Sequence, residues 1–281
     1  MNTWHAFRMA VAFLTRFSLP RFAGKDPSPE HHARSVGFYP LVGLGLGGLT
    51  AGAGWVLTLA GLPPLAVGVL MTAWLAWLSA GLHLDGLADT FDGLGARIKG
   101  RPAALAAMTD SASGPMGTAA LVLVLVLKAA LLGQLAVTHQ WWGLLLAPAV
   151  GRWSAVGLMA ALPPAKNQGL GHGVGTGVGW RVWATAGLLA GAVTGGLGYT
   201  VGLGTHSAAQ VATESGPQLA IPLAAGLLGA LGAALGLGRI ARRAFGGVTG
   251  DVCGAGIELS ETAFLAGWMM GPTVSEWLYF W

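Results

Sequence analysis

Seven stretches of the sequence are apolar, nearly free of charge and long enough to cross a membrane. A helix needs about 20 mostly apolar residues to span the hydrocarbon core of a bilayer. Of the 281 residues only 9% are charged, whereas roughly 25% are charged in ordinary soluble domains. The sequence therefore predicts an all-α polytopic transmembrane bundle of about seven spans, built as one domain over residues 1–281. The predicted spans are 36–61, 64–84, 117–137, 141–162, 182–203, 218–238 and 262–281.

The first twenty residues differ from these stretches, because Arg8 and Arg16 interrupt their apolar run. A charged side chain at the centre of the bilayer costs about 2.5–3.5 kcal/mol on insertion scales. The segment also lacks the small-residue cleavage site of a secretory signal peptide. We therefore expect residues 1–20 to form an amphipathic helix that lies in the membrane interface.

The basic residues are confined to alternate connections between the predicted spans. All of the 15 Lys and Arg residues except Lys128 and Arg152 lie in the amino-terminal segment or in connections 85–116, 163–181 and 239–261. The positive-inside rule places these segments in the cytoplasm, so we expect a multi-pass protein of the cell (inner) membrane. Basic residues dispersed in this way do not indicate a nucleic-acid surface. The sequence is compatible with a homo-oligomer and does not define its size.

The connection 85–116 begins with three aspartates, Asp85, Asp89 and Asp92, spaced at i, i+4 and i+7. On a helix these side chains share one face within an arc of about 60°. Like charges at this spacing repel each other unless a cation lies between them. Carboxylates without His or Cys select hard cations such as Mg²⁺ or Mn²⁺. The alternative is a solvated acidic face, but the apolar neighbours Leu87 and Phe91 favour a pocket.

Three further polar residues lie near these aspartates in the sequence. His83 falls on the other side of the same helix, so it is either an interfacial or a substrate-contacting histidine rather than a shared metal ligand. Asp110 and Ser111 precede the next span, after a short helix predicted to have Pro102 in its first turn. They are candidates for substrate binding, with a turn or a helix cap as the alternative.

A second polar cluster occupies the connection 239–261. Arg242 and Arg243 precede a glycine-rich turn that leads to Thr249, Gly250 and Asp251. Guanidinium groups and exposed backbone N–H groups both suit phosphate oxygens, so these residues are candidates for substrate binding. Contact with lipid headgroups is the alternative for the arginines.

The glycine-rich run 169–179, which contains His172, lacks the Lys-Ser/Thr pair of a phosphate-binding loop. We interpret it as a flexible connection.

Stacked carboxylates, a fourth aspartate and nearby basic residues together indicate metal-assisted phosphoryl transfer. The sequence Asp-Gly-Leu-Ala-Asp at 85–89 partly resembles the motif of the CDP-alcohol phosphotransferases. The two mid-span cations Lys128 and Arg152 are the features that a transporter would share. A CDP-alcohol-type phosphotransferase and a corrinoid or cobalt transporter are therefore the alternative functions.

A closer resemblance covers nearly the whole chain. The sequence is similar to the cobalamin (5′-phosphate) synthase family, also called adenosylcobinamide-GDP ribazoletransferases, in five motifs that occur in order. These are FLTRFSLP (13–20), FYPLVGLGLGGL (38–49), HLDGLADTFDG (83–93), MTDSASGPMG (108–117) and GGVTGDVCGAGIELSE (246–261). Departures from the family pattern occur in 111–116 and in 163–181.

The resemblance implies a Mg²⁺-dependent transferase in cobalamin biosynthesis. Such an enzyme transfers the cobinamide phosphate of adenosylcobinamide-GDP to α-ribazole or α-ribazole 5′-phosphate and releases GMP. Carried onto this chain, the resemblance implies that Asp85, Asp89 and Asp92 hold metal, and that Asp251 completes the metal site or acts as the base. It also implies phosphate contacts by Arg16, Arg34, Arg242 and Arg243.

Overall fold

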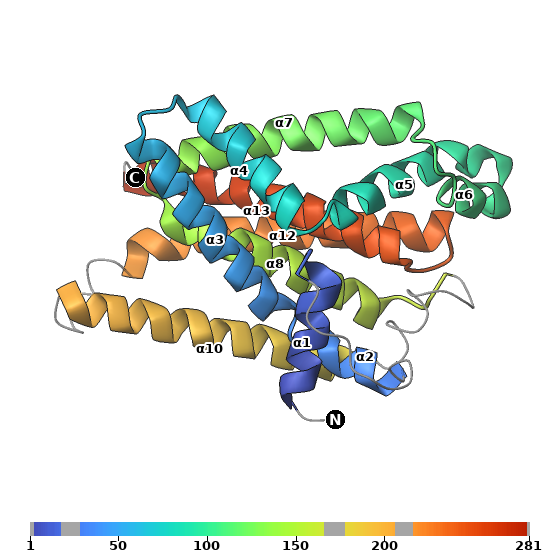
Figure 1. The fold of residues 1–281 in the computed structure, drawn as a ribbon, viewed down its shortest axis with the longest axis horizontal. Coiled ribbons are helices and arrows are strands. Elements are labelled where there is room, and N and C mark those ends of the chain that lie inside the picture. The colour runs from blue at the N-terminus through green and yellow to red at the C-terminus, as the bar shows by residue number, and fades with distance from the viewer. Residues whose placement is uncertain (1–2, 18–28, 166–177, 206–215, 280–281) are drawn as a thin grey trace.

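The computed structural model describes residues 3–17, 29–165, 178–205 and 216–279, and it is helical throughout (Figure 1). These residues contain no strand, only an isolated bridge between Pro164 and Val248. The helices are α1 (Thr3–Leu14), α2 (Pro29–Val36), α3 (Tyr39–Leu59), α4 (Pro64–Leu78), α5 (Leu82–Ala96), η1 (Arg97–Lys99), α6 (Arg101–Ala107), α7 (Pro115–Val137), α8 (Trp141–Ala161), α10 (Trp180–Thr205), α12 (Gly216–Ala244) and α13 (Gly250–Tyr279).

Four of the described helices are long and apolar enough to cross a membrane, namely α3, α7, α8 and the part of α12 from Leu219 to Ala244. A fifth span results if α4 and the helical segment Leu82–Lys99 are counted as one broken span. An all-helical chain with several helices of membrane-crossing length is therefore confirmed. The predicted number of about seven spans is not confirmed by length and composition.

The predicted span 64–84 is wrong as a continuous helix. The helix α4 ends at Leu78, and Ala80 and Gly81 both adopt left-handed backbone conformations with φ of 52° and 72°. Glycine tolerates this region without the steric penalty of a Cβ, so Gly81 is suited to the turn. The chain bends by 92° here, and α5 leads to α6 at one end of the bundle (Figure 1). The three aspartates of α5 are thereby carried to that end.

The predicted connection 239–261 is also largely helical. The helix α12 continues to Ala244, and α13 begins at Gly250, so only five residues join the two. Thr249 ends this connection, and its hydroxyl oxygen accepts a hydrogen bond of 3.2 Å from the backbone N–H of Val252. Such a side-chain cap satisfies one of the free N–H groups at the start of a helix. Glu258 and Glu261 consequently lie inside the bundle rather than in a loop.

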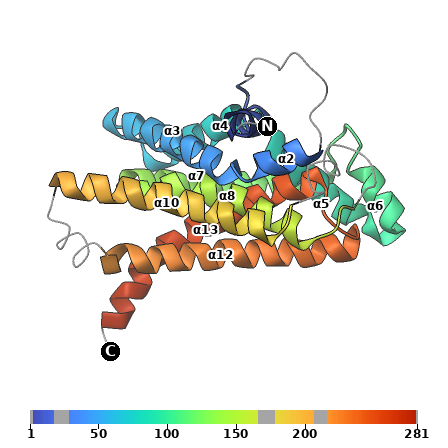
Figure 2. The ribbon, with the colours of Figure 1, turned by 90° about the horizontal axis from the view of Figure 1, so that it is seen from below.

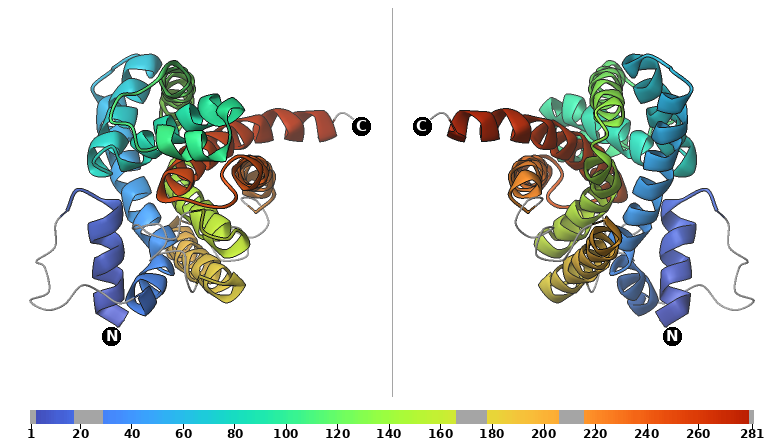
Figure 3. Two further views of the ribbon diagram at one scale, coloured as in Figure 1. Left: turned by 90° about the vertical axis from the view of Figure 1, so that its right-hand side faces the viewer. Right: turned by 90° about the vertical axis from the view of Figure 1, so that its left-hand side faces the viewer.

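The helix α13 packs against α12, α8, α5 and α7 along the bundle, and its carboxyl-terminal end extends away from the other helices (Figures 2 and 3). Glycines allow the other helices to pack closely as well. An added Cβ at Gly47 would lie 2.1 Å from the carbonyl oxygen of Leu145, and one at Gly68 would lie 1.7 Å from that of Ala129. Small residues at such contacts let helix backbones approach where lipid supplies no hydrophobic force between helices.

The first helix, α1, has 12 residues and is therefore about 18 Å long at 1.5 Å per residue. This is shorter than the hydrocarbon core of a bilayer, which is about 30 Å thick. Figure 1 shows α1 running steeply across the direction of the long helices α7, α8 and α10. Its position in the membrane interface stays a prediction.

Candidate functional site

Three connections that are distant in the sequence meet at the end of the bundle where α5 and α6 lie (Figure 1). The backbone N–H of Val248 donates to the carbonyl of Pro163 at 2.8 Å, and that of Ala165 donates to Val248 at 2.9 Å. The guanidinium of Arg101 donates to the carbonyl of Ala165 at 3.1 Å. The start of α6, the segment after α8 and the turn between α12 and α13 are thus held together.

At this end α5 and α13 touch through their backbones. A Cβ at Gly86 would lie 2.8 Å from the carbonyl oxygen of Asp251, and one at Gly254 would lie 3.3 Å from the Cα of His83. The structure thereby places the first turn of α13 against the segment of α5 that carries Asp85 and Asp89. The two acidic regions that the sequence assigns to separate connections are neighbours in space.

Asp92 has a second neighbour that its spacing does not indicate. Its carboxylate accepts hydrogen bonds from the backbone N–H groups of Gly114 at 2.7 Å and Gly117 at 2.8 Å. Both groups belong to the start of α7, where the free N–H groups and the helix dipole favour a negative charge. Asp92 therefore ties α5 to the amino-terminal end of α7, and its role as a metal ligand stays a prediction.

The contact of α5 with α13 at Gly86 and Gly254 is called the crossing below. The acidic residues on either side of it fit a hard cation that is shared with a phosphate substrate. Asp85 is exposed, while Asp89 and Asp251 are half-buried, and all three carry carboxylate oxygens. Within the described part of the chain, no three His, Cys, Asp or Glu side chains converge on one metal position. Mg²⁺ usually needs no such cage, because it binds through one or two carboxylates together with waters and substrate phosphates.

The remaining predicted residues of the second cluster have separate surroundings. Besides capping α13, the Thr249 hydroxyl lies 3.3 Å from Oδ2 of Asp251, to which it donates. Gly250 has open space around the position of a Cβ. Arg242 and Arg243 are exposed in the last turn of α12, at the same end of the bundle as α13 begins.

Asp110 and Ser111 lie in the exposed connection between α6 and α7. The Asp110 carboxylate accepts a hydrogen bond of 3.0 Å from the backbone N–H of Ala112, which is the geometry of an Asx turn. The alternative of a turn is therefore observed for Asp110, and substrate binding by either residue stays a prediction.

Two predicted phosphate contacts lie on other segments, Arg16 just after the end of α1 and Arg34 on α2. The Arg16 guanidinium stacks 3.9 Å from the ring centre of Trp77, near the end of α4. Arg34 lies on α2, which packs against α1 and α10 rather than against α5. It lines a cavity of about 360 Å³ together with Phe38 and Thr185. The structure does not bring Arg34 to the contact of α5 with α13. The part of the glycine-rich run from 169 to 177, which contains His172, lies outside the described residues.

A buried ionic network lies next to the contact of α5 with α13, and the two glutamates in it were not identified from the sequence. Lys128 on α7 pairs with Glu258 at 2.5 Å and with Glu261 at 2.8 Å, and Arg152 on α8 pairs with Glu261 as well. Nδ1 of His83 lies 3.4 Å from a terminal guanidinium nitrogen of Arg152. All five residues are at most 6% exposed, so His83 is buried in this network, and its contact with substrate stays a prediction. The two cations within apolar spans are the signal from which buried acidic partners could have been expected.

The sequence was compared with protein families, with characterised proteins and with solved structures. The profile of the family described as Cobalamin-5-phosphate synthase matches residues 6–269. The chain is 38% identical to the adenosylcobinamide-GDP ribazoletransferase of Pseudomonas fluorescens, with 93% of this chain and 97% of that protein covered. It is 36% identical to the protein of the same name in Roseiflexus, with 94% and 90% covered. No solved structure matches the chain. The chain belongs to the cobalamin-5-phosphate synthase family.

Proposed function

We propose that this chain is an adenosylcobinamide-GDP ribazoletransferase. The name is that of its relatives, which match it along almost their whole length. A hydroxyl oxygen of α-ribazole or α-ribazole 5′-phosphate forms a bond to the cobinamide-bound phosphorus. The bond from that phosphorus to the bridging oxygen breaks, and GMP leaves with this oxygen. The products are GMP and adenosylcobalamin or its 5′-phosphate.

The observation that supports this reaction best is the contact at Gly86, where the backbone of α5 between Asp85 and Asp89 lies against the backbone of Asp251. In the proposal Asp85 and Asp89 hold Mg²⁺, which when bound neutralises charge on the phosphate oxygens. Asp251, oriented by the hydroxyl of Thr249, accepts the proton of the attacking hydroxyl.

Basic side chains near the crossing complete the proposed substrate site. The exposed Arg242 and Arg243 are suited to hold the phosphate oxygens of the guanosine nucleotide, because a guanidinium binds two oxygens at once. Arg101, whose guanidinium lies against the turn at Gly246, adds positive charge at the same end.

We infer that the protein is a multi-pass enzyme of the inner membrane with this site facing the cytoplasm. Basic residues of α5–α6 and of α12 occupy one end of the bundle, as the positive-inside rule requires for a cytoplasmic end. Seven spans result if α10 and α13 cross the membrane too. With 26 and 30 residues, they are about 39 and 45 Å long.

A direct assay tests the proposed reaction. Purified protein in lipid vesicles, supplied with adenosylcobinamide-GDP, α-ribazole and Mg²⁺, should release GMP and form cobalamin in equal amounts. The Asp85→Asn protein, which we expect to be inactive, is the matched control for contaminating activity. Release of CMP from a CDP-alcohol, or uptake of a corrinoid without chemical change, would contradict the proposal and favour a CDP-alcohol phosphotransferase or a transporter.

A further inference from the structure

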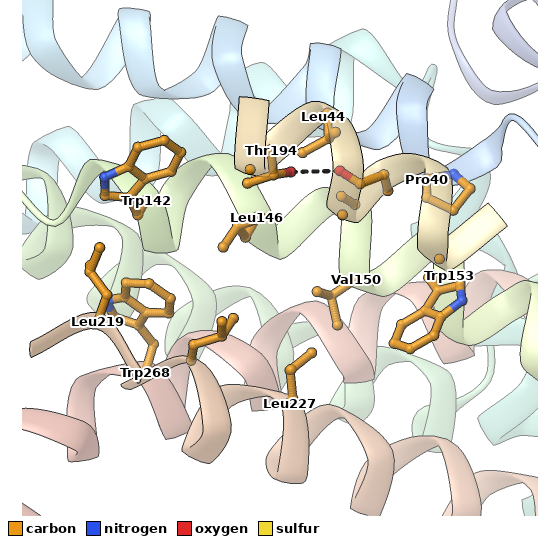
Figure 4. Close-up of a pocket in the computed structure, with 16 residues that line it drawn as sticks. Pro40, Leu44, Trp142, Leu146, Val150, Trp153, Thr194, Leu219, Leu227 and Trp268 are labelled. Atoms are coloured by element: carbon orange, nitrogen blue, oxygen red, sulfur yellow. Dashed lines mark hydrogen bonds between the residues drawn. The ribbon is translucent and has the colours of Figure 1, made fainter. Parts of the chain in front are cut away.

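A long apolar groove runs along α8 (Figure 4), and none of the residues that line it belongs to α5 or to the first turn of α13. Its volume is about 450 Å³. The helix α8 forms its floor, α3 and α13 contribute to its walls, and α10 and α12 form its two sides. Both side helices pack against α8, but they are scarcely in contact with each other. The groove therefore lies between two long, largely apolar helices, α10 and α12.

The side chains along the groove leave almost no hydrogen-bonding group free. The hydroxyl of Thr194 donates to the carbonyl of Ala190 at 2.8 Å (Figure 4). The indole N–H of Trp153 donates to the carbonyl of Trp183 at 3.0 Å, and that of Trp268 donates to Gln140 at 3.2 Å. Water enters a cavity only where two or more polar groups can bind it. The middle of the groove, lined by leucine and valine side chains, therefore requires an apolar occupant.

The length of the groove indicates what this occupant is. Trp142 and Trp153 lie toward opposite ends of the groove (Figure 4) and are eleven residues apart on α8. At 1.5 Å per residue this separation is about 16 Å. One leaflet of a bilayer contributes about 15 Å of the roughly 30 Å hydrocarbon core. The groove thus has the length of one acyl chain that extends through one leaflet.

The residues of α10 that face the groove are small, which gives the chain room. Gly187, Ala190, Gly191, Thr194 and Gly195 all line it. A Cβ at Gly191 or Gly195 would meet no atom within 4 Å. An empty groove of this size would deprive its walls of dispersion contacts over their whole length. We propose that this groove is a binding site for one acyl chain of a bilayer phospholipid, held between α10 and α12 on the surface of α8.

Filling the groove tests the site. The variant Gly191→Leu/Gly195→Leu places two leucine side chains in the open space of the groove. The matched control is Gly196→Leu on the same helix, because Gly196 does not line the groove and has no atom within 4 Å of its Cβ position. Thermal unfolding of all three proteins verifies that the variants are folded.

The probe is a phosphatidylcholine with a photoreactive diazirine in its acyl chain, mixed into the vesicles that contain each protein. After irradiation, mass spectrometry should locate label on Leu146 and Val150 of α8 in the unchanged protein and in Gly196→Leu. This label should be lost in Gly191→Leu/Gly195→Leu, while exposed Leu188 of α10 and Leu228 of α12 remain labelled. Absence of label from α8 in the unchanged protein, or equal labelling of α8 in the filled variant, would overturn the proposal.

Discussion

The three aspartates of α5 share one helical face but have different neighbours. Asp92 binds two backbone N–H groups of α7, whereas Asp85 and Asp89 flank the glycine that touches Asp251. Their spacing in the sequence does not distinguish the three residues, because all three lie on the same face of one helix. Their partners come from other helices, so Asp92 is held by α7, and a role of Asp85 and Asp89 in chemistry stays a prediction.

Loss of either of these two carboxylates should abolish most of the transfer reaction. In Asp85→Asn and Asp89→Asn, GMP release should fall at least about 100-fold, because metal stabilisation is worth several kcal/mol and each 1.36 kcal/mol is tenfold in rate. The measurement is GMP release against Mg²⁺ concentration by correctly inserted protein. The change Asp26→Asn, outside both polar clusters, should leave turnover nearly unchanged. Near-normal turnover in both α5 variants would refute the metal assignment.

Asp92→Asn should reduce stability rather than chemistry alone. An asparagine amide has one acceptor oxygen, so it can replace only one of the two hydrogen bonds to α7. Loss of a charge-assisted bond should lower the free energy of unfolding by about 1.5–3 kcal/mol, measured by denaturation in detergent. If Asp92→Asn unfolds like the unchanged protein but loses its response to Mg²⁺, the metal role is the correct one.

At the scale of the helices, paired charges and glycine contacts determine how α13 is seated. Glu258 and Glu261 on α13 meet Lys128 of α7 and Arg152 of α8, and the four charges balance. Glutamates spaced at i, i+3 lie on one side of a helix, so a single face of α13 meets both partner helices. The ionic network thereby selects one rotation of α13 about its axis, and Asp251 turns with it.

Removal of one partner of this network should be more damaging than removal of a pair. Lys128→Met leaves Glu258 as an uncompensated buried charge, which should cost about 3–5 kcal/mol of stability. Lys128→Met/Glu258→Gln retains the pair of Arg152 with Glu261 and should recover most of this loss. Thermal unfolding in one detergent compares the single and double variants. Equal destabilisation of both would show that the charges of this pair are not coupled.

At the scale of the whole molecule, the polar connections gather at one end of an apolar bundle. The α5–α6 region and the turn from α12 to α13 lie at this end, and the connections from α3 to α4 and from α7 to α8 lie at the other (Figure 1). The positive-inside rule predicts that connections rich in Lys and Arg lie in the cytoplasm. Because these connections lie at one end of the bundle, the rule predicts that this end faces the cytoplasm.

Reporter fusions test this orientation. A periplasmic reporter inserted at position 139, between α7 and α8, should be active, and one inserted at position 105, in α6, should be inactive. The connection 138–140 has no Lys or Arg, whereas Arg97, Lys99 and Arg101 lie close to position 105 in the sequence, which is the physical reason for the difference. The reverse pattern of reporter activity would exclude a cytoplasmic site.

The sequence by itself determined the class of fold and the family, because hydropathy, charge placement and local motifs act within single segments. It predicted the helical aspartate face, the short helix beginning near Pro102 and the family. It did not predict the break in 64–84, and it predicted a connection up to residue 261 where α13 already begins at Gly250. An apolar segment satisfies the hydropathy criterion whether or not it bends, and the bend depends on two left-handed residues.

Only the tertiary structure decided which polar residues act together. The contact of Gly86 with Asp251, the binding of Asp92 by α7 and the pairing of Lys128 with Glu258 each join segments at least 22 residues apart. Helix periodicity says nothing about such pairs, because it fixes the face on which a side chain lies but not the helix that faces it. Buried charges must find partners in an apolar interior, and the packing of α13 determines which ones they find.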